Sequence, residues 1–169
     1  MDVNKDLFRM DVSSQPFCTN FHSTDIRMTT RYNENDLMSS IWSAIHESGH
    51  GRYEMGLSQG VPGMPSSNSV SLGIHESQSR LWENNIGRSQ AFINLLFPII
   101  QEFFPGQMKG ISAQNLFSEI NFIEPSFIRT EADELTYHYH IMIRYEIEKK
   151  LINNELKVSD VREYWNAMY

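Results

Sequence analysis

Two histidines that stand four residues apart give this sequence its clearest chemical signal. They are His46 and His50, in the segment His-Glu-Ser-Gly-His at residues 46–50. Side chains four residues apart lie on one face of an α-helix, so both imidazoles can reach the same metal ion. Glu47 lies beside that face, where its carboxylate can take a proton from a water that Zn²⁺ has acidified. The pattern predicts a zinc centre that attacks a peptide carbonyl.

A short pattern of this kind also occurs by chance, in helices that bind no metal. A pair of core histidines beside a surface glutamate has the same letters. Gly49 and Gly51 favour the metal interpretation, because both residues permit close packing near the site.

The third metal ligand has to come from another part of the chain, since catalytic zinc ions usually take three protein ligands. The candidates His75, Glu76 and Glu83 all lie in the helical segment 73–84. Glu76 and Glu83 are seven residues apart and share a helix face, so periodicity does not choose between them. Either glutamate can instead face solvent or form an ion pair with Arg80.

The helix that must carry the two histidines has clear ends. Asn35 or Asp36 can cap its start, and the apolar period continues to about Glu54, with a stop near Gly56. Residues 56–69 are rich in glycine, proline and serine and predict a long loop. Such a loop is more often functional than idle, although a disordered connector has the same composition.

Helical periodicity also dominates the rest of the chain. Further helices are predicted at about residues 71–98, 113–120 and 129–151, and after a capping Ser159. Pro98 is expected to end or kink the first of them. Residues 1–34 hold only short β-prone pieces such as 25–30, which leaves little room for a large sheet. The predicted fold class is mainly α, with long helices that carry the His-Glu-x-x-His site.

The composition excludes several classes of protein. The 169 residues are 40% apolar and 21% charged, which suits a packed core rather than a disordered chain. A net charge of -7 disfavours nonspecific nucleic-acid binding. Cys18 is the single cysteine, so an internal disulfide and a Cys-rich zinc cluster are excluded. With no visible secretory signal or bilayer-spanning run, we expect a cytoplasmic protein that binds neither nucleic acid nor membrane.

Several motifs together resemble one known family. Residues 75–84, His-Glu-Ser-Gln-Ser-Arg-Leu-Trp-Glu-Asn, follow the helix with His46 and His50 as in the carboxypeptidase Taq family of zinc metallocarboxypeptidases. Residues 25–29 match that family's Asp-x-Arg-x-Thr motif, and residues 128–133 match its Ile-Arg-x-x-Ala-Asp motif. The four motifs occur in family order, and the resemblance covers nearly the whole chain.

The resemblance implies a role for each residue of the site. It implies that His46, His50 and Glu76 bind the metal and that Glu47 is the general base. It also implies broad removal of C-terminal amino acids from peptides and proteins, and a homodimer in the full-length family. Zn²⁺ is the expected metal, although Co²⁺ or Mn²⁺ can occupy similar nitrogen and oxygen sites.

The chain departs from the family pattern in two ways. Gln15-Pro-Phe stands where the family has His-Pro-Phe. Because glutamine does not titrate near neutral pH, an acid–base or ligand role of this position is in doubt. Family members also have a helical region before this segment and a Gly-x-x-Gln-Asp-x-His-Trp motif after it. We therefore interpret residues 1–169 as the catalytic middle segment of a larger helical metallopeptidase. The alternative is a truncated, non-catalytic remnant that still binds zinc.

A carboxypeptidase must also bind the free carboxylate of its substrate, which arginine does through its bidentate fork. By the family resemblance, Arg129 in the Ile-Arg motif is the first candidate, and Arg27 is the second. Each can instead form a structural ion pair, Arg129 with Asp133. Tyr137 and His138 could donate hydrogen bonds to an oxyanion, although helix packing is the preferred interpretation. A zinc endopeptidase would need no carboxylate site.

Overall fold

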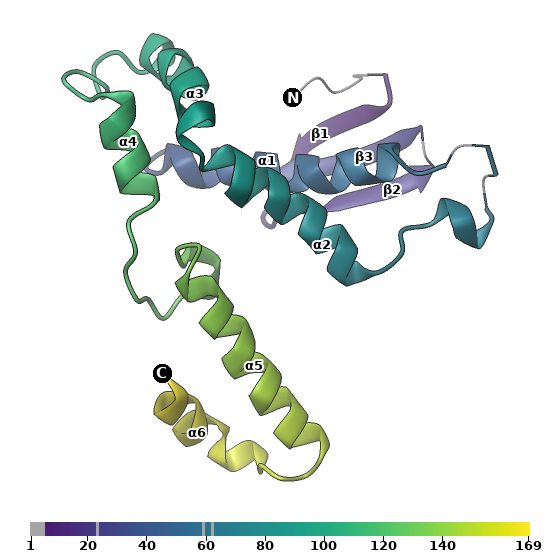
Figure 1. The fold of residues 1–169 in the computed structure, drawn as a ribbon. Helices are drawn as coiled ribbons and strands as arrows, with labels where there is room; N and C mark the ends of the chain where they lie inside the picture. Colours follow the sequence, from purple (N-terminus) through teal and green to yellow (C-terminus); the bar gives the residue numbers. More distant parts are fainter. Residues whose placement is uncertain (1–5, 23, 59, 62) are drawn as a thin grey trace. The chain divides into compact units, whose positions relative to one another are not determined.

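The computed structural model describes residues 6–22, 24–58, 60–61 and 63–169, and most of them are helical, as the sequence predicts (Figure 1). The chain forms two compact units, Met1–Gln114 and Asn115–Tyr169. No helix within the described residues combines the length and the apolar character that crossing a membrane requires.

A small sheet begins the first unit. It consists of β1 (Phe8–Val12), β2 (Cys18–His22) and β3 (Asp25–Thr30) in the order β1-β3-β2. The central strand runs parallel to β1 and antiparallel to β2. Its side chains alternate between the two faces, so Ile26 and Met28 are buried on one face. The β-prone piece at residues 25–30 is thus confirmed as a strand within a small sheet.

Ile26 of the central strand is paired with a residue of each neighbouring strand. This residue lies opposite Phe8 of β1 and Asn20 of β2. The β2 ladder is irregular between Asn20 and His22, near the end of that short strand. The sheet thereby presents a buried apolar face and holds Asn20 at its edge strand.

Helix α1 (Leu37–Met55) packs against β3. Its predicted start is confirmed, because the Asp36 carboxylate accepts a hydrogen bond from the backbone N–H of Ser39. The helix ends at Gly56, whose own N–H bonds back to carbonyls of the last turn. The following loop contains one short 3₁₀ turn, Pro65–Ser67, among its described residues.

The prediction of one continuous helix over residues 71–98 is wrong. The chain forms α2 (Leu72–Arg80), a π-helical segment (Leu81–Gly87) and a separate helix α3 (Gln90–Phe103). The break arises because the Ser89 hydroxyl accepts from the Phe92 N–H and starts a new helix.

Of the two effects predicted for Pro98, an end or a kink, the end of the helix is not found. Pro98 lies inside the helix, which continues to Phe103. Proline removes one helical hydrogen bond, but Phe97 and Ile100 on either side of it are buried, and their packing holds the turn.

The remaining helices follow the predictions with one large shift. Helix α4 (Ala113–Ile120) is confirmed, whereas α5 spans Thr136–Ile152 and is preceded by a 3₁₀ turn at Arg129–Glu131. The helix predicted from Arg129 starts later because the Asp133 carboxylate accepts from the backbone N–H groups of Leu135 and Thr136.

The last helix also differs from the prediction at its start. Helix α6 (Val161–Met168) follows a 3₁₀ turn at Val158–Asp160, and Asp160 precedes its first residue. Ser159 does not cap this helix, because its hydroxyl donates to the Asp160 carboxylate instead.

Candidate metal centre

The site lies where α1 and α2 approach each other closely. A Cβ atom at Gly49 would lie 2.6 Å from the Cα atom of Ser79, a contact that real side chains do not make. Ser79 is fully buried at this crossing. Only glycine at position 49 lets the two backbones come this close. The sequence prediction that Gly49 permits close packing is therefore confirmed.

This approach brings three potential ligands together, two from α1 and one from α2. One ligand atom from each of His46, His50 and Glu76 lies within 4.8 Å of the other two. The Glu76 Oε2 atom is 3.6 Å from His46 Nε2 and 3.5 Å from His50 Nε2. Two ligands of a tetrahedral zinc ion, each about 2.0–2.2 Å from it, are roughly 3.4 Å apart. The donor set and its spacing therefore fit a divalent cation.

The glutamate that periodicity left as an alternative, Glu83, lies on the other side of His46. Its Oε2 atom is 2.7 Å from His46 Nδ1 and 3.1 Å from Arg80 Nη1. Metal-binding histidines commonly bond a carboxylate through the nitrogen that does not face the metal. The geometry groups Glu76 with both Nε2 atoms and places Glu83 behind the ring, in the π-helical segment Leu81–Gly87.

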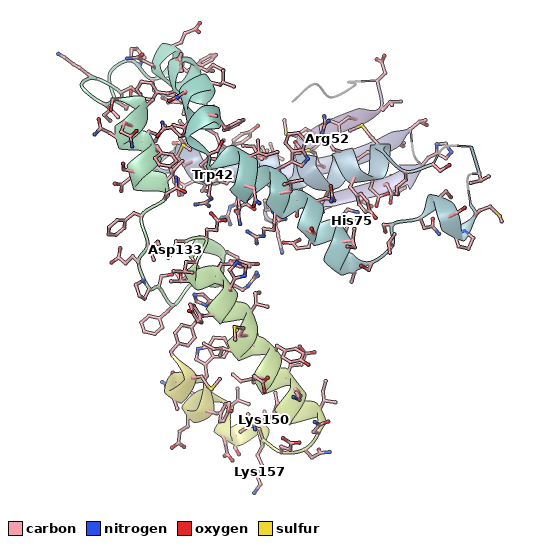
Figure 2. All side chains as sticks on the ribbon, viewed as in Figure 1. Trp42, Arg52, His75, Asp133, Lys150 and Lys157 are labelled. Atoms are coloured by element: carbon pink, nitrogen blue, oxygen red, sulfur yellow. The ribbon has the colours of Figure 1, made fainter. Side chains whose placement is uncertain are left out.

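His75, the third candidate from sequence, uses both ring nitrogens elsewhere. It lies on α2 (Figure 2), and its Nδ1 atom is 2.6 Å from His50 Nδ1. Its Nε2 atom is 2.6 Å from Glu54 Oε1. Glu54 had no role in the sequence interpretation beyond marking the end of the helix. Its spacing could have revealed it, since it follows His50 by four residues and so shares its helix face.

The predicted ion pair with Arg80 is present together with the ligand cluster. Arg80 Nε donates to Glu76 Oε1 at 3.0 Å, so the second oxygen of this carboxylate is left facing the histidines. The contact with His50, whose Nε2 atom is 3.5 Å away, is the largest cause that lowers the pKa of Glu76 to about 2, and His46 and Arg80 add to this effect. Glu76 is thereby held as a carboxylate, the form that binds a cation.

Glu47, the single acid of the segment His46–His50, is buried, with 7% of its surface exposed. Burial raises the pKa of Glu47, and the negative charges of Glu76 and Glu83 act in the same direction. His46 and His50 oppose the rise. A general base works best when its pKa lies near the working pH, so a raised glutamate pKa suits proton transfer.

Arg27, one of the two predicted substrate contacts, is bound within its own strand. Its Nε and Nη2 atoms donate to the Asp25 carboxylate at 2.9 and 2.8 Å, and the guanidinium stacks over the Phe21 ring. Arg27 alternates with Ile26 and Met28, which are buried on the opposite face of β3. The structure does not bring Arg27 to the ligand cluster, and its contacts favour the structural ion pair.

The other residues of that motif stabilise the first strands. The Thr29 hydroxyl accepts from the Phe17 N–H at 3.1 Å and from the Ser13 hydroxyl at 2.7 Å. Gln15, at the family's histidine position, contributes its backbone carbonyl to the same group of bonds. The motif at residues 25–29 therefore joins the segment around Gln15 to β3.

Arg129, the first candidate for the substrate carboxylate, belongs to the second unit. Its Nη1 atom donates to the Tyr137 hydroxyl at 2.6 Å, and the guanidinium lies over the Tyr137 ring. The predicted partner Asp133 is engaged with backbone N–H groups at the start of α5. The Ile-Arg motif and Tyr137, both singled out from sequence, are thus in contact.

Comparisons with known proteins identify the family of the chain. The model of the family described as carboxypeptidase Taq (M32) metallopeptidase matches residues 4–169. The chain is 44% identical to thermostable carboxypeptidase 1 of Pyrococcus furiosus over 158 residues, which cover 94% of this chain and 32% of the relative. It is 47% identical to carboxypeptidase 1 of Bacillus subtilis over 161 residues, or 95% of this chain and 32% of the relative.

Solved structures show the same similarity. The M32 carboxypeptidase from Deinococcus radiodurans R1 superposes with a TM-score of 0.94 at 40% identity, over 98% of this chain and 33% of that one. Metallocarboxypeptidase 1 of Trypanosoma cruzi superposes with a TM-score of 0.91 at 39% identity, over 98% and 33%. The chain therefore spans about a third of the length of the relatives that it matches.

Proposed function

The chain belongs to the carboxypeptidase Taq (M32) metallopeptidase family, and we propose that it supplies the metal-binding and proton-transferring residues of a zinc-dependent metallocarboxypeptidase. His46, His50 and Glu76 hold the zinc ion, and Glu47 is the general base. The observation that carries the proposal is the gathering of three donor atoms within 4.8 Å of one another. Because the chain spans 32% of these relatives, the activity of the complete enzyme is part of the proposal.

The donor set of two imidazole nitrogens and one carboxylate oxygen is a known type of catalytic zinc site. When bound there, the metal supplies a lowered pKa for a water molecule and polarisation of the substrate carbonyl. Co²⁺ and Mn²⁺ accept the same donors, so the protein ligands alone do not select zinc.

Glu47 provides the proton transfers of the proposed reaction. Its carboxylate takes a proton from the attacking water as the new carbon–oxygen bond forms. The same carboxyl group gives that proton to the leaving amine as the peptide bond breaks. Burial favours the protonated form of Glu47, as the raised pKa indicates, so the side chain holds the proton between the two transfers.

An arginine is proposed to hold the substrate's terminal carboxylate, with Arg129 as the first candidate and Arg27 as the second. A guanidinium has five N–H donors, and the contact of Arg129 with the Tyr137 hydroxyl uses one of them. Arg27 would first have to leave the Asp25 carboxylate, to which it is bound through two nitrogens. This difference supports Arg129 as the stronger candidate.

A peptide with a blocked C-terminus tests the proposed exopeptidase activity. We would load the full chain with zinc and supply one peptide with a free C-terminus and its C-terminally amidated analogue. The proposal predicts release of single residues from the free peptide and none from the amidated one. Equal cleavage of both peptides would identify a zinc endopeptidase. Zinc binding without cleavage of either peptide would identify the non-catalytic remnant.

The complete protein is proposed to act as a homodimer on peptides and on protein C-termini, as the family resemblance implies. Light scattering on the purified chain, with and without zinc, measures its mass in solution. A dimer mass supports this part of the proposal, and a strictly monomeric chain at high concentration contradicts it for this segment.

A further inference from the structure

A chain of hydrogen bonds extends from His50 away from the ligand cluster. Its first link joins His50 Nδ1 to His75 Nδ1 at 2.6 Å, and the second joins His75 Nε2 to Glu54 Oε1 at 2.6 Å. The third link runs from Asn20 Nδ2 to Glu54 Oε2 at 2.5 Å. Four residues from β2, α1 and α2 are therefore connected in series.

When both imidazoles are neutral, the carboxylate at the end of this chain fixes the direction of every bond in it. A carboxylate oxygen only accepts hydrogen bonds, so His75 donates to Glu54 through Nε2–H. A neutral imidazole then keeps Nδ1 as an acceptor, and His50 must donate to it through its own Nδ1–H. His50 consequently carries its lone pair on Nε2, the atom that lies 3.5 Å from Glu76 Oε2.

Burial makes these bonds effective. Glu54 is 7% exposed, and both imidazoles are partly buried. Hydrogen bonds are electrostatically stronger at such places than in water. The two histidines of the cluster differ at Nδ1, since His46 Nδ1 bonds the Glu83 carboxylate directly, whereas His50 Nδ1 bonds His75, which in turn bonds Glu54.

We propose that His75 and Glu54 are positioning residues that hold His50 in the Nδ1–H tautomer and orient its ring toward the cation. The inference rests on the proposed function, because it concerns the same metal site. Neither residue contacts the substrate in this account. Supporting partners of metal-binding histidines typically change metal affinity by about 10–100-fold when they are removed.

Asn20 allows the direction of the bonds to be reversed by design. In Glu54→Gln, with Asn20 keeping Nδ2 toward position 54, the new amide turns its oxygen toward Asn20 Nδ2 and its NH₂ group toward His75. His75 then accepts at Nε2 and donates from Nδ1, so His50 carries its proton on Nε2, where it blocks a cation. Adding Asn20→Asp places a carboxylate opposite the amide NH₂, which turns the amide oxygen back toward His75 and restores the original direction.

The test measures the zinc dissociation constant of the full chain by competition with a chelator. His75→Phe keeps a ring but removes both bonds, and we expect it to weaken zinc binding by about 10–100-fold. Glu54→Gln is expected to weaken it too, and Asn20→Asp with Glu54→Gln to recover most of the loss. Glu34→Gln makes the same chemical change at an exposed position and should bind zinc as the wild type does.

The outcomes separate this inference from the proposed function. Wild-type zinc affinity in both His75→Phe and Glu54→Gln overturns the positioning role. A loss of zinc affinity in Glu54→Gln that the added Asn20→Asp does not recover overturns it as well. If His75→Phe fails to fold, the Glu54→Gln pair decides alone, because a purely structural role predicts no rescue. A wild-type chain that binds no zinc, or whose binding survives His46→Ala, overturns the proposed function instead.

Discussion

Helix α1 has two contrasting faces, one toward β3 and one toward α2. Toward β3 the buried partners include the apolar side chains of Ile26 and Met28, at 0% and 1% exposure. Toward α2 and the π-helical segment that follows it, the same helix presents His46, His50 and Glu54, and each of them bonds a polar side chain across the interface. One helix thus belongs to a hydrophobic core and to a buried polar network at the same time.

The contrast indicates a division of energetic roles between the two faces. Burial of apolar surface contributes roughly 25 cal/mol per Å², so the sheet face supplies stability. Buried ionisable groups contribute little net stability, and they are costly when a partner is missing. We infer that packing of the apolar face holds the polar face in place, and that the polar face serves metal binding and proton transfer rather than stability.

Among the changes to either face of α1, removal of the Glu47 charge is expected to have the largest effect, and the effect is on the rate of peptide hydrolysis. Loss of a general base typically lowers the rate by about 10²–10⁴-fold, so Glu47→Gln should lose nearly all peptide hydrolysis. It should retain zinc binding, because Glu47 is not among the three clustered donors. Release of the C-terminal residue and zinc affinity are measured on the same preparation. Hydrolysis at the wild-type rate would contradict the assignment of the base.

The same variant should make the metal-free fold more stable at neutral pH. Burial raises the folded-state pKa of Glu47 above its ordinary value of 4.5, so the ionised side chain destabilises the folded protein. Glutamine carries no such charge. The advantage shrinks as the pH falls through the folded-state pKa and vanishes below the ordinary value, where wild-type Glu47 is protonated in both states. Urea unfolding at neutral and acidic pH measures it, and a variant less stable than wild type at neutral pH contradicts the account.

Truncation of the apolar face should cost stability. Ile26→Ala deletes a fully buried side chain, and such changes typically cost about 2–5 kcal/mol. Val12→Ala in the neighbouring strand is the control, because 63% of that side chain's surface is exposed. The free energies of unfolding come from urea titrations of both variants. Equal losses in the two variants would show that the face against β3 is not the stabilising one.

A methyl group at the α1–α2 crossing should separate the two helices. Gly49→Ala would place Cβ 2.6 Å from Ser79 Cα, and forced overpacking costs about 1–3 kcal/mol. Zinc affinity should fall as well, because the ligands come from both helices. Gly73→Ala in α2 is the matched control, since its Cβ would meet only the Ser71 hydroxyl at 3.8 Å. Wild-type stability and zinc affinity in Gly49→Ala would contradict the close approach.

The pH dependence that Glu76 adds should be the smallest effect. Its folded-state pKa is lowered to about 2 from 4.5, so its contribution is fully present above pH 4.5 and is lost as the pH falls toward 2. The side chain is 47% exposed, so solvent screening limits this contribution to no more than about 1 kcal/mol. Glu76→Gln should flatten the acid limb of the stability curve of the metal-free protein. An unchanged limb would argue against the contacts with His50 and Arg80.

The sequence predicted the parts of the site that depend on local spacing. The start of α1 follows from Asp36 and the apolar period, and the shared face of His46 and His50 follows from four-residue spacing. The choice of Glu76 over Glu83 did not follow from spacing, since both lie on one helical face. It depends on how α2 crosses α1 at Gly49, which is a property of packing between distant segments.

The features that the sequence did not predict have the same origin. The π-helical segment Leu81–Gly87 and the new start at Ser89 interrupt a continuous apolar pattern. Strand β1 is formed through pairing with β3, a partner about twenty residues away along the chain. Glu54 acquires its role only when His75 on α2 reaches it.

Zinc titration of the metal-free full chain tests the central claim most directly. We expect the wild-type chain to bind one zinc ion tightly and the combined variant His46→Ala, His50→Ala and Glu76→Ala to bind none, while the far-ultraviolet circular dichroism of the variant stays helical. Tight binding of zinc that persists in the folded triple variant, or no binding by the wild-type chain, would contradict the claim that these three residues form one metal site.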